Sequence, residues 1–272
     1  MRLKLSEISF LRIVNAFTRR IKNIPFKLTY VFSEDGKQNR KRIKRVYNLY
    51  KDQTCVLLAN GPSLKNEDLS ITNKFITFGL NRIYVGFEKM NFKLDYLVCI
   101  NKLVAKQFCH EIDSLDCTKF LYWNSKKYYK SSQKTLWLHQ GLSNDIFSTD
   151  LSKSINPAAT VTYAALQVIY YMGFKKVIIL GLDHNFQLDK SKIPNTTEKY
   201  THQKDVNHFI DNYFPKGTKW ETPDLYSSEF FYKKARKYFE DDGRKIFDCT
   251  KNGKCDVFIK KSIDTVLEQS IN

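Results

Sequence analysis

Short side chains with amide and hydroxyl groups directly follow an apolar run early in the chain. The run from Cys55 to Ala59 ends in Asn60-Gly61-Pro62-Ser63. A short apolar run closed by turn-forming residues predicts a buried strand, and α/β sheets bind ligands at the carboxyl ends of such strands. Gly61 allows close backbone approach and Pro62 fixes the turn, while Asn60 and Ser63 can hydrogen-bond a phosphate, a ribose or a base. An ordinary turn with Ser63 as the N-cap of a helix would use the same residues.

Three further strands are predicted to end in a polar residue that could contact a ligand. Asn81 occurs in F-G-L-N-R, Asn101 in V-C-I-N and Asp183 in L-G-L-D-H-N-F. The carboxyl edge of the predicted sheet is therefore lined with amides and one carboxylate. Asparagine is also a common turn residue, so each of these positions has a purely structural alternative.

Alternating strands and helices must position these residues. The predicted strands are Cys55 to Ala59, Phe75 to Gly79, Tyr96 to Ile100, Phe120 to Trp123, Val177 to Leu182 and Lys245 to Cys249. A helix from about Thr160 to Met172 follows Pro157 and ends before Gly173. This order predicts a single Rossmann-like α/β domain with a mostly parallel sheet and helices on both faces.

The predicted domain spans 51–272 and follows a basic helical extension, 1–50. Its polar and aromatic segment of about 187–222 shows little periodicity and is predicted to be a lid-like loop.

The composition limits the kinds of partner. The chain of 272 residues has 45 Lys and Arg against 28 Asp and Glu, a formal net charge of +17. That excess favours an anionic partner such as nucleic acid, anionic lipid or a charged sugar nucleotide, although lysine-rich surfaces also occur without one. The six cysteines form no C-x-x-C pair, so neither a zinc site nor a disulfide framework is expected. No run reaches the length of a membrane span and no signal peptide begins the chain, which predicts a cytoplasmic protein.

Two basic segments precede the predicted domain. Residues 1–25 alternate apolar and basic side chains at near-helical spacing until Pro25, which is expected to end the helix. Such a helix can lie on an anionic membrane, which would make the protein peripheral at the inner face of the cytoplasmic membrane, or pack on its own domain or on a second subunit of a homo-oligomer. Residues 37–45 hold six basic side chains without interleaved aromatic residues. They predict a solvated helix face, and no nucleic acid is expected as a partner.

These motifs together resemble a known group of enzymes. The resemblance runs from about Cys55 to Phe258 and rests on N-G-P-S-L, the asparagines that end the second and third strands, A-A-T-V-T-Y-A-A-L-Q-V-I-Y-Y-M-G-F-K-K-V-I-I-L-G-L-D-H-N-F, and a late N-H-F followed by Y-F-x-x-G. The chain resembles the bacterial CMP-sialic-acid-dependent sialyltransferases and the related pterin pyrophosphokinase-like domain of polysaccharide and flagellin glycosylation proteins. The resemblance implies a GT-A variant of the Rossmann-like fold.

The resemblance also implies residue roles in nucleotide binding. In the sialyltransferases the positions that match Asn60 to Ser63, Asn81 and Asn101 hold cytidine monophosphate. Thr160 and Thr162 stand near that family's phosphate-binding serine, at a predicted helix start that favours anions. His184 and Asn185 replace aromatic residues that touch the donor, and Asn185 is accordingly placed in the nucleotide site.

The general base in that family is a histidine in a late loop. His202 and His208 are the late candidates here, and His208 is predicted because Asn207 and several aromatic residues adjoin it. His184 is the alternative, potentially held by Asp183, which is expected to be an orienting or acceptor-side residue. Histidine suits this task because its pKa lies near working pH.

The implied reaction is inverting transfer of sialic acid or a related keto-sugar acid from a CMP-activated donor to a surface-glycan or glycolipid acceptor. No Asp-x-Asp triplet is present to hold an ion, so metal-independent activity without a cofactor is expected. A magnesium-dependent pyrophosphokinase of the pterin type is an alternative, although a P-loop is absent. A basic module that binds nucleic acid or membrane is the non-enzymatic alternative.

Overall fold

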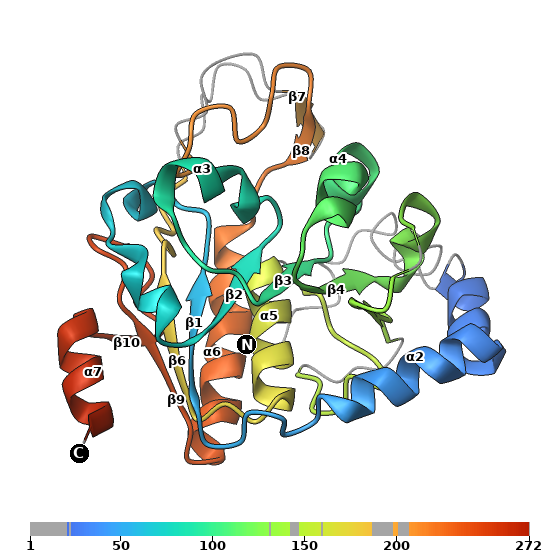
Figure 1. Cartoon of the computed structure of the whole chain (residues 1–272), viewed down its shortest axis with the longest axis horizontal. Coiled ribbons are helices and arrows are strands. Elements are labelled where there is room, and N and C mark those ends of the chain that lie inside the picture. The colour runs from blue at the N-terminus through green and yellow to red at the C-terminus, as the bar shows by residue number, and fades with distance from the viewer. Residues whose placement is uncertain are drawn as a thin grey trace, which may run out of the picture.

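Eight apolar segments pair into one open sheet whose neighbouring strands are all parallel (Figure 1). The computed structural model describes residues 21, 23–130, 132–141, 147–158, 160–186, 198–200 and 207–271. Their order across the sheet is β10-β9-β6-β1-β2-β3-β4-β5. The strands are β1 (Thr54–Leu58), β2 (Ile76–Leu80), β3 (Tyr96–Cys99), β4 (Thr118–Tyr122), β5 (Thr135–Leu138), β6 (Lys176–Leu180), β9 (Lys245–Asp248) and β10 (Ile259–Lys260). The predicted α/β class with a parallel sheet is confirmed.

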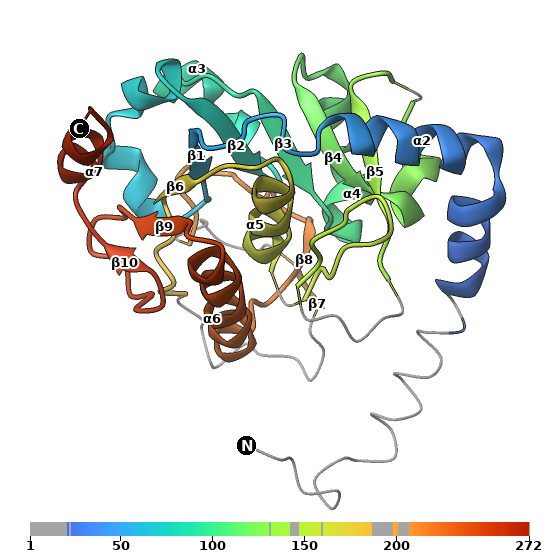
Figure 2. The same ribbon diagram turned by 90° about the horizontal axis from the view of Figure 1, so that it is seen from below.

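Helices cover both faces of this sheet, as expected for parallel strands that are buried on both sides. Alternate residues of β1 separate the two cores: Cys55 and Leu57 face one, whereas Val56 and Leu58 face the other. Figure 2 shows α5 and α6 side by side on the first face. The helices are α2 (Glu34–Arg45), α3 (Phe87–Met90), α4 (Lys102–Ser114), α5 (Val161–Tyr171), α6 (Leu225–Asp241) and α7 (Ile263–Ile271), and the 3-10 turns are η2 (Pro62–Asn66), η3 (Leu69–Asn73), η4 (Ile83–Gly86) and η5 (Trp123–Tyr128).

Two strands of the main sheet were not predicted, and several strand bounds differ from the predicted ones by one or two residues. These two strands are β5 and β10, and β10 has only two residues, too few to show a period. The fourth strand begins two residues before its predicted start, because Lys119 interrupts the apolar pattern. That lysine is buried, and its ammonium group donates to the backbone oxygen of Leu115 at 2.6 Å.

Two elements lie outside the main sheet. β7 (Glu198–Tyr200) and β8 (Lys219–Glu221) form an antiparallel ribbon within the predicted lid segment, of which residues 187–197 and 201–206 lie outside the described residues.

Residues 23–32 are helical, so the expected end of the helix at Pro25 is wrong. A proline loses the hydrogen bond of its own missing N–H and its ring crowds the carbonyl four residues earlier, but the residues after it can still form helical hydrogen bonds.

His139 stands at the end of β5 beneath the helical residues 23–32. It is 3% exposed, and both ring nitrogens lack a hydrogen-bond partner among the described residues. Its ring stacks on Tyr30 with centroids 4.8 Å apart. Burial, followed by the positive charge of Lys27, lowers the pKa of His139 from 6.5 to about 4.

The depressed pKa of His139 predicts an acid-sensitive fold. Between pH 6.5 and about 4 the unfolded chain binds a proton at His139 that the folded chain does not, so stability falls as pH falls. The loss on going from pH 7 to pH 5 is about 2 kcal/mol, at 1.36 kcal/mol per pKa unit. Urea denaturation at the two pH values should show this loss in the wild type and lack it in His139→Phe.

The exposed His110 offers a matched control, since His110→Phe should retain the wild-type dependence on pH. Equal pH dependence in the wild type and His139→Phe would show that another group causes any acid sensitivity.

Candidate active site

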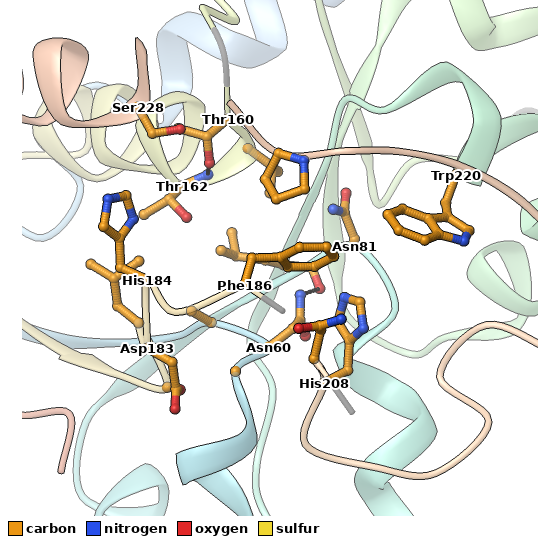
Figure 3. A pocket seen from close by; sticks show the side chains of 18 of the residues that line it. Asn60, Asn81, Thr160, Thr162, Asp183, His184, Phe186, His208, Trp220 and Ser228 are labelled. Atoms are coloured by element: carbon orange, nitrogen blue, oxygen red, sulfur yellow. Dashed lines mark hydrogen bonds between the residues drawn. The ribbon is translucent and has the colours of Figure 1, made fainter. Parts of the chain in front are cut away.

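A cavity of about 240 Å³ opens at the carboxyl ends of β1 and β6, where the strand order reverses direction (Figure 3). Such a switch point is the usual ligand site of an open α/β sheet. The predicted site residues that line it are Asn60, Gly61, Pro62, Asn81, Asn101, Thr160, Thr162, Asp183, His184, Asn185 and His208. Segments more than 100 residues apart in sequence therefore converge on one cavity.

Asp183 joins the two sides of the switch point. Its Oδ1 accepts from the backbone N–H of Ser63 at 3.0 Å, and its Oδ2 accepts from the Ser63 hydroxyl at 2.7 Å. Gly61 is required between them, because an added Cβ would overlap the Asp183 carboxylate and lie 2.6 Å from the backbone oxygen of Gly181. Ser63 does not line the cavity. The structure thus gives Asp183 and Ser63 a shared role in holding the loop.

Asn60 and Asn81 present buried amide oxygens at the cavity. Nδ2 of Asn60 donates to the backbone oxygen of Leu80 at 3.1 Å, which orients its side chain. Asn81 adopts the left-handed conformation with φ of 48°, which asparagine tolerates better than most residues. The Oδ1 atoms of both residues are buried without a hydrogen-bond partner among the described residues. Each oxygen carries a desolvation cost unless a ligand or water donates to it.

Asn101 and Thr160 cap the two helices that border the cavity. The Oδ1 atom of Asn101 accepts from the backbone N–H groups of Leu103 and Val104 at the start of α4. The Thr160 hydroxyl accepts from the N–H of Thr162 at the start of α5 and lies 3.3 Å from the Tyr232 hydroxyl. Both residues therefore cap helices, and both also line the cavity.

His184 is held by a residue that the sequence did not indicate. Its Nε2 lies 3.1 Å from Oε1 of Glu229 on α6, whereas Asp183 bonds to Ser63 instead. The His184 side chain is 6% exposed and its φ is 52°, a strained conformation for histidine. The expectation that Asp183 holds His184 is wrong, because the His184 ring contacts Glu229 on α6 and both Asp183 oxygens accept from Ser63.

His208 belongs to a segment that is bonded to the ends of β1 and β2. The N–H of Phe209 donates to the backbone oxygen of Asn60 at 3.1 Å. The N–H of Arg82 donates to the Tyr213 hydroxyl, and its buried guanidinium donates to the Tyr213 backbone oxygen. The His208 ring stacks on Tyr213 with centroids 4.0 Å apart. These bonds bring His208 to the cavity, while His202 lies outside the described residues.

Aromatic rings form another wall of the cavity. Phe186 lies 5.7 Å from Trp220 between ring centroids, and Trp220 stacks on Phe214 at 6.5 Å. Phe186 follows β6, whereas the other two rings belong to the predicted lid segment. Flat apolar surfaces of this kind can stack on a nucleobase or on the apolar face of a sugar.

Sequence reasoning missed the contribution of α6. Ser228, Glu229 and Tyr232 lie within about one turn of this helix, and Ser228 and Tyr232 line the cavity beside Thr160. Burial raises the pKa of Tyr232 to about 12, so its phenol remains a neutral hydrogen-bond donor. The only sequence signal was the cluster of polar residues in Y-S-S-E-F-F-Y, which equally fits an exposed helix face.

The family assignment rests on more than half of the chain. Residues 32–189 match the family model described as 6-hydroxymethylpterin diphosphokinase MptE-like. The chain belongs to this MptE-like family. The match covers α2 through the end of β6, including the Asn60 loop and Asp183. It confirms the predicted relation to the pterin pyrophosphokinase-like domain.

A solved glycosyltransferase shares the fold of this MptE-like chain. It is the MAf glycosyltransferase from Magnetospirillum magneticum AMB-1, with 10% sequence identity and a TM-score of 0.51. The similarity covers 82% of this chain but only 38% of that protein, so the chain spans well under half of its length. No functionally curated protein matches the sequence.

Two searches of the described residues bear on the predicted partners. None of their helices combines the length and apolar character needed to span a bilayer. No three His, Cys, Asp or Glu side chains gather in the described part of the chain as they would around a metal ion.

The Asp183 contact predicts different effects for two substitutions. Asp183→Ala removes both acceptors of Ser63 and should destabilise the protein by about 3 kcal/mol, since hydrogen bonds to charged groups contribute about 1.5–3 kcal/mol each. Asp183→Asn should cost less, because its amide oxygen can accept from the Ser63 N–H while its amino group donates to the hydroxyl. Urea denaturation measures both changes.

Asp256→Ala is a control at an exposed aspartate and should stay within about 0.5 kcal/mol of the wild type. Equal destabilisation by Asp183→Asn and Asp183→Ala would show that the charge of Asp183, not its hydrogen-bond geometry, holds the loop.

Proposed function

We propose that the protein is a glycosyltransferase. Its proposed donor is an acidic sugar activated by CMP, a nucleotide whose nucleobase carries an amino group. The observation that carries this proposal is the pair of buried amide oxygens of Asn60 and Asn81 at the cavity, neither of which has a hydrogen-bond partner in the described part of the chain. The proposed reaction inverts the sugar's configuration, needs no metal and delivers the sugar to a surface-glycan or glycolipid acceptor. The shared fold with a glycosyltransferase supports the reaction class.

The Oδ1 atoms of Asn60 and Asn81, which lack partners among the described residues, favour a nucleobase with several N–H groups. The amino group of cytosine has two hydrogens and can donate to two carbonyl oxygens, whereas uracil presents a carbonyl oxygen at the same ring position. A uracil nucleotide would leave at least one oxygen buried without a donor, which costs about 1–3 kcal/mol. Adenine also carries an amino group. Direct comparison of the nucleotides must therefore include ATP.

The start of α5 suits the phosphate of such a donor. Helix N-termini attract anions through the helix dipole, which acts at this end of the cavity although Thr160 already caps the N–H of Thr162. The hydroxyls of Thr160, Thr162 and Tyr232 surround this end of the cavity. Because the Tyr232 phenol stays protonated, it can donate to the departing phosphate. Preorganised donors of this kind stabilise the charge that develops on a leaving group, and this supports metal-independent transfer.

The resemblance predicts His208 as the general base, but the contacts favour His184. His208 lies beside the hydrogen bonds that join its segment to Asn60 and Arg82, at the end of the cavity where the nucleobase is proposed to bind. The ring of His184 lies 6.1 Å from that of Tyr232, at the proposed phosphate end, and Figure 3 shows the two imidazoles apart. The reacting sugar carbon is bonded to the phosphate, so the general base must act at the phosphate end of the cavity. We therefore assign the role of general base to His184.

Glu229 would set the proton positions of this base. A carboxylate at Nε2 favours the tautomer that carries the proton there, which leaves Nδ1 free to accept one. In the proposed step Nδ1 takes the proton of the acceptor hydroxyl and the acceptor oxygen bonds to the anomeric carbon. The bond from that carbon to the phosphate oxygen breaks, and CMP leaves with the electron pair.

A diphosphokinase is the second candidate, because the family description names that activity. It would transfer a diphosphate from ATP with magnesium held by carboxylates. Asp183 is the best placed carboxylate for this task, but both of its oxygens accept from Ser63. This engagement favours the glycosyltransferase proposal.

The first functional prediction concerns nucleotide selectivity. CMP should bind at least tenfold more tightly than UMP in calorimetry without metal, because UMP leaves a buried oxygen unpaired. Asn81→Asp should reduce CMP affinity through the charge it introduces at the cavity. Asn91→Asp, at another asparagine with positive φ and outside the cavity lining, should not.

Binding of ATP only in the presence of magnesium, with no binding of CMP, would instead support the diphosphokinase. Equal affinities for CMP and UMP would contradict the assigned role of the two amide oxygens.

The second functional prediction separates the two histidines. His184→Ala should lower kcat by ~100 to 10,000-fold with CMP affinity retained, the usual contribution of a positioned base. Glu229→Ala should lower kcat by about 10 to 100-fold, because the ring of His184 loses its fixed orientation. Glu240→Ala is the matched control at the other end of α6, where Glu240 pairs with Arg236.

Turnover should survive His208→Ala within about tenfold. The opposite pattern, with His208→Ala inactive and His184→Ala active, would show that His208 in the late loop is the general base, as the resemblance predicts.

A further inference from the structure

The helical residues 23–32 stand at the margin of the molecule and are attached to it along one side (Figure 2). Tyr30 is 1% exposed, and its hydroxyl donates to the backbone oxygen of Ser152 at 3.1 Å. The indole N–H of Trp123 donates to the Thr29 hydroxyl, and the Asn124 amide donates to Asn23. These contacts fix which side of the helix faces solvent.

An apolar stripe occupies the solvent side of this helix. It consists of Ile21, Ile24, Leu28 and Phe32, which are 48%, 44%, 50% and 69% exposed. Their spacing of three, four and four residues keeps them within roughly 80° of the helix circumference, at about 100° per residue, and opposite Tyr30. A contiguous apolar face that remains in water marks a docking surface.

The charge around the stripe selects the partner. Lys27 is exposed on the same helix, and α2, which follows directly, exposes Lys37, Lys41, Lys44 and Arg45. Of the two acidic residues at the start of α2, Asp35 is bonded to Lys126. Residues 1–20 contain five basic residues and one acidic residue. An apolar stripe within basic surroundings is the pattern of a helix that lies in an anionic lipid interface.

We infer that the outer stripe docks the protein on an anionic membrane surface, with Ile21, Ile24, Leu28 and Phe32 inserted among the lipids. A second copy of the chain is a poorer partner, because each copy carries a formal charge of +17 and would bring like charges together. This inference does not depend on the proposed chemistry. A membrane location would bring the cavity to acceptors that are themselves lipid-linked.

Vesicle co-sedimentation with matched variants tests the inference. The full chain should bind mixed vesicles of phosphatidylglycerol and phosphatidylcholine, and should bind vesicles of phosphatidylcholine alone only weakly. Salt at 0.5 M should release the protein from the mixed vesicles, because it shortens the screening length of the charge attraction to between about 3 and 10 Å. Leu28→Asp and Phe32→Asp should each lower the affinity for the anionic vesicles at least fivefold. Leu49→Asp makes the same change at a leucine that is also 50% exposed, and it should reduce binding less than twofold.

Thermal unfolding of each variant checks that the fold is retained, as expected for substitutions at exposed positions. Equal vesicle binding by Leu28→Asp and Leu49→Asp would overturn the inference. So would light scattering that finds a dimer in the wild type and a monomer in Leu28→Asp, because the stripe would then be a subunit interface.

Discussion

The pair of hydrogen bonds between Asp183 and Ser63 is the contact on which the candidate site depends. It ties the loop after β1 to the loop after β6, at the point where the sheet order reverses. The two loops can approach this closely only because Gly61 has no side chain. It adds to the backbone hydrogen bond that the N–H of Gly61 donates to the oxygen of Gly181 at 2.9 Å, and together these bonds hold Asn60 and His184 on one connected frame. The carboxylate that sequence patterns suggest for catalysis therefore acts here as a structural link.

A second set of buried polar contacts adds the late segment to this frame. Arg82 donates to both the hydroxyl and the backbone oxygen of Tyr213, forms an ion pair with Glu111 and lies 3.7 Å from the Phe108 ring centroid. A buried arginine with this many partners is costly to disrupt, since removing one partner leaves an uncompensated charge. The aromatic wall is consequently attached to the end of β2.

One scaffold here is compatible with two chemistries that the relatives' names mention, diphosphate transfer and glycosyl transfer. Fold alone does not choose between them, because function resides in the side chains that the fold presents. The choice lies with the amide oxygens of Asn60 and Asn81, which have no hydrogen-bond partner among the described residues, and with the partners of Asp183 and His184.

The sequence by itself determined the parallel α/β architecture, most strand positions, the α5 helix, and the gathering of Asn60, Asn81, Asn101 and Asp183 at one sheet edge. These features follow from local periodicity, turn residues and the rule that parallel strands end on the same side. Only the tertiary structure decided that Asp183 bonds to Ser63 and that His184 bonds to Glu229. Such pairs join positions 45 and 120 residues apart. The spacing of residues along the chain does not predict these pairs, because they form only when helices and loops pack together in three dimensions.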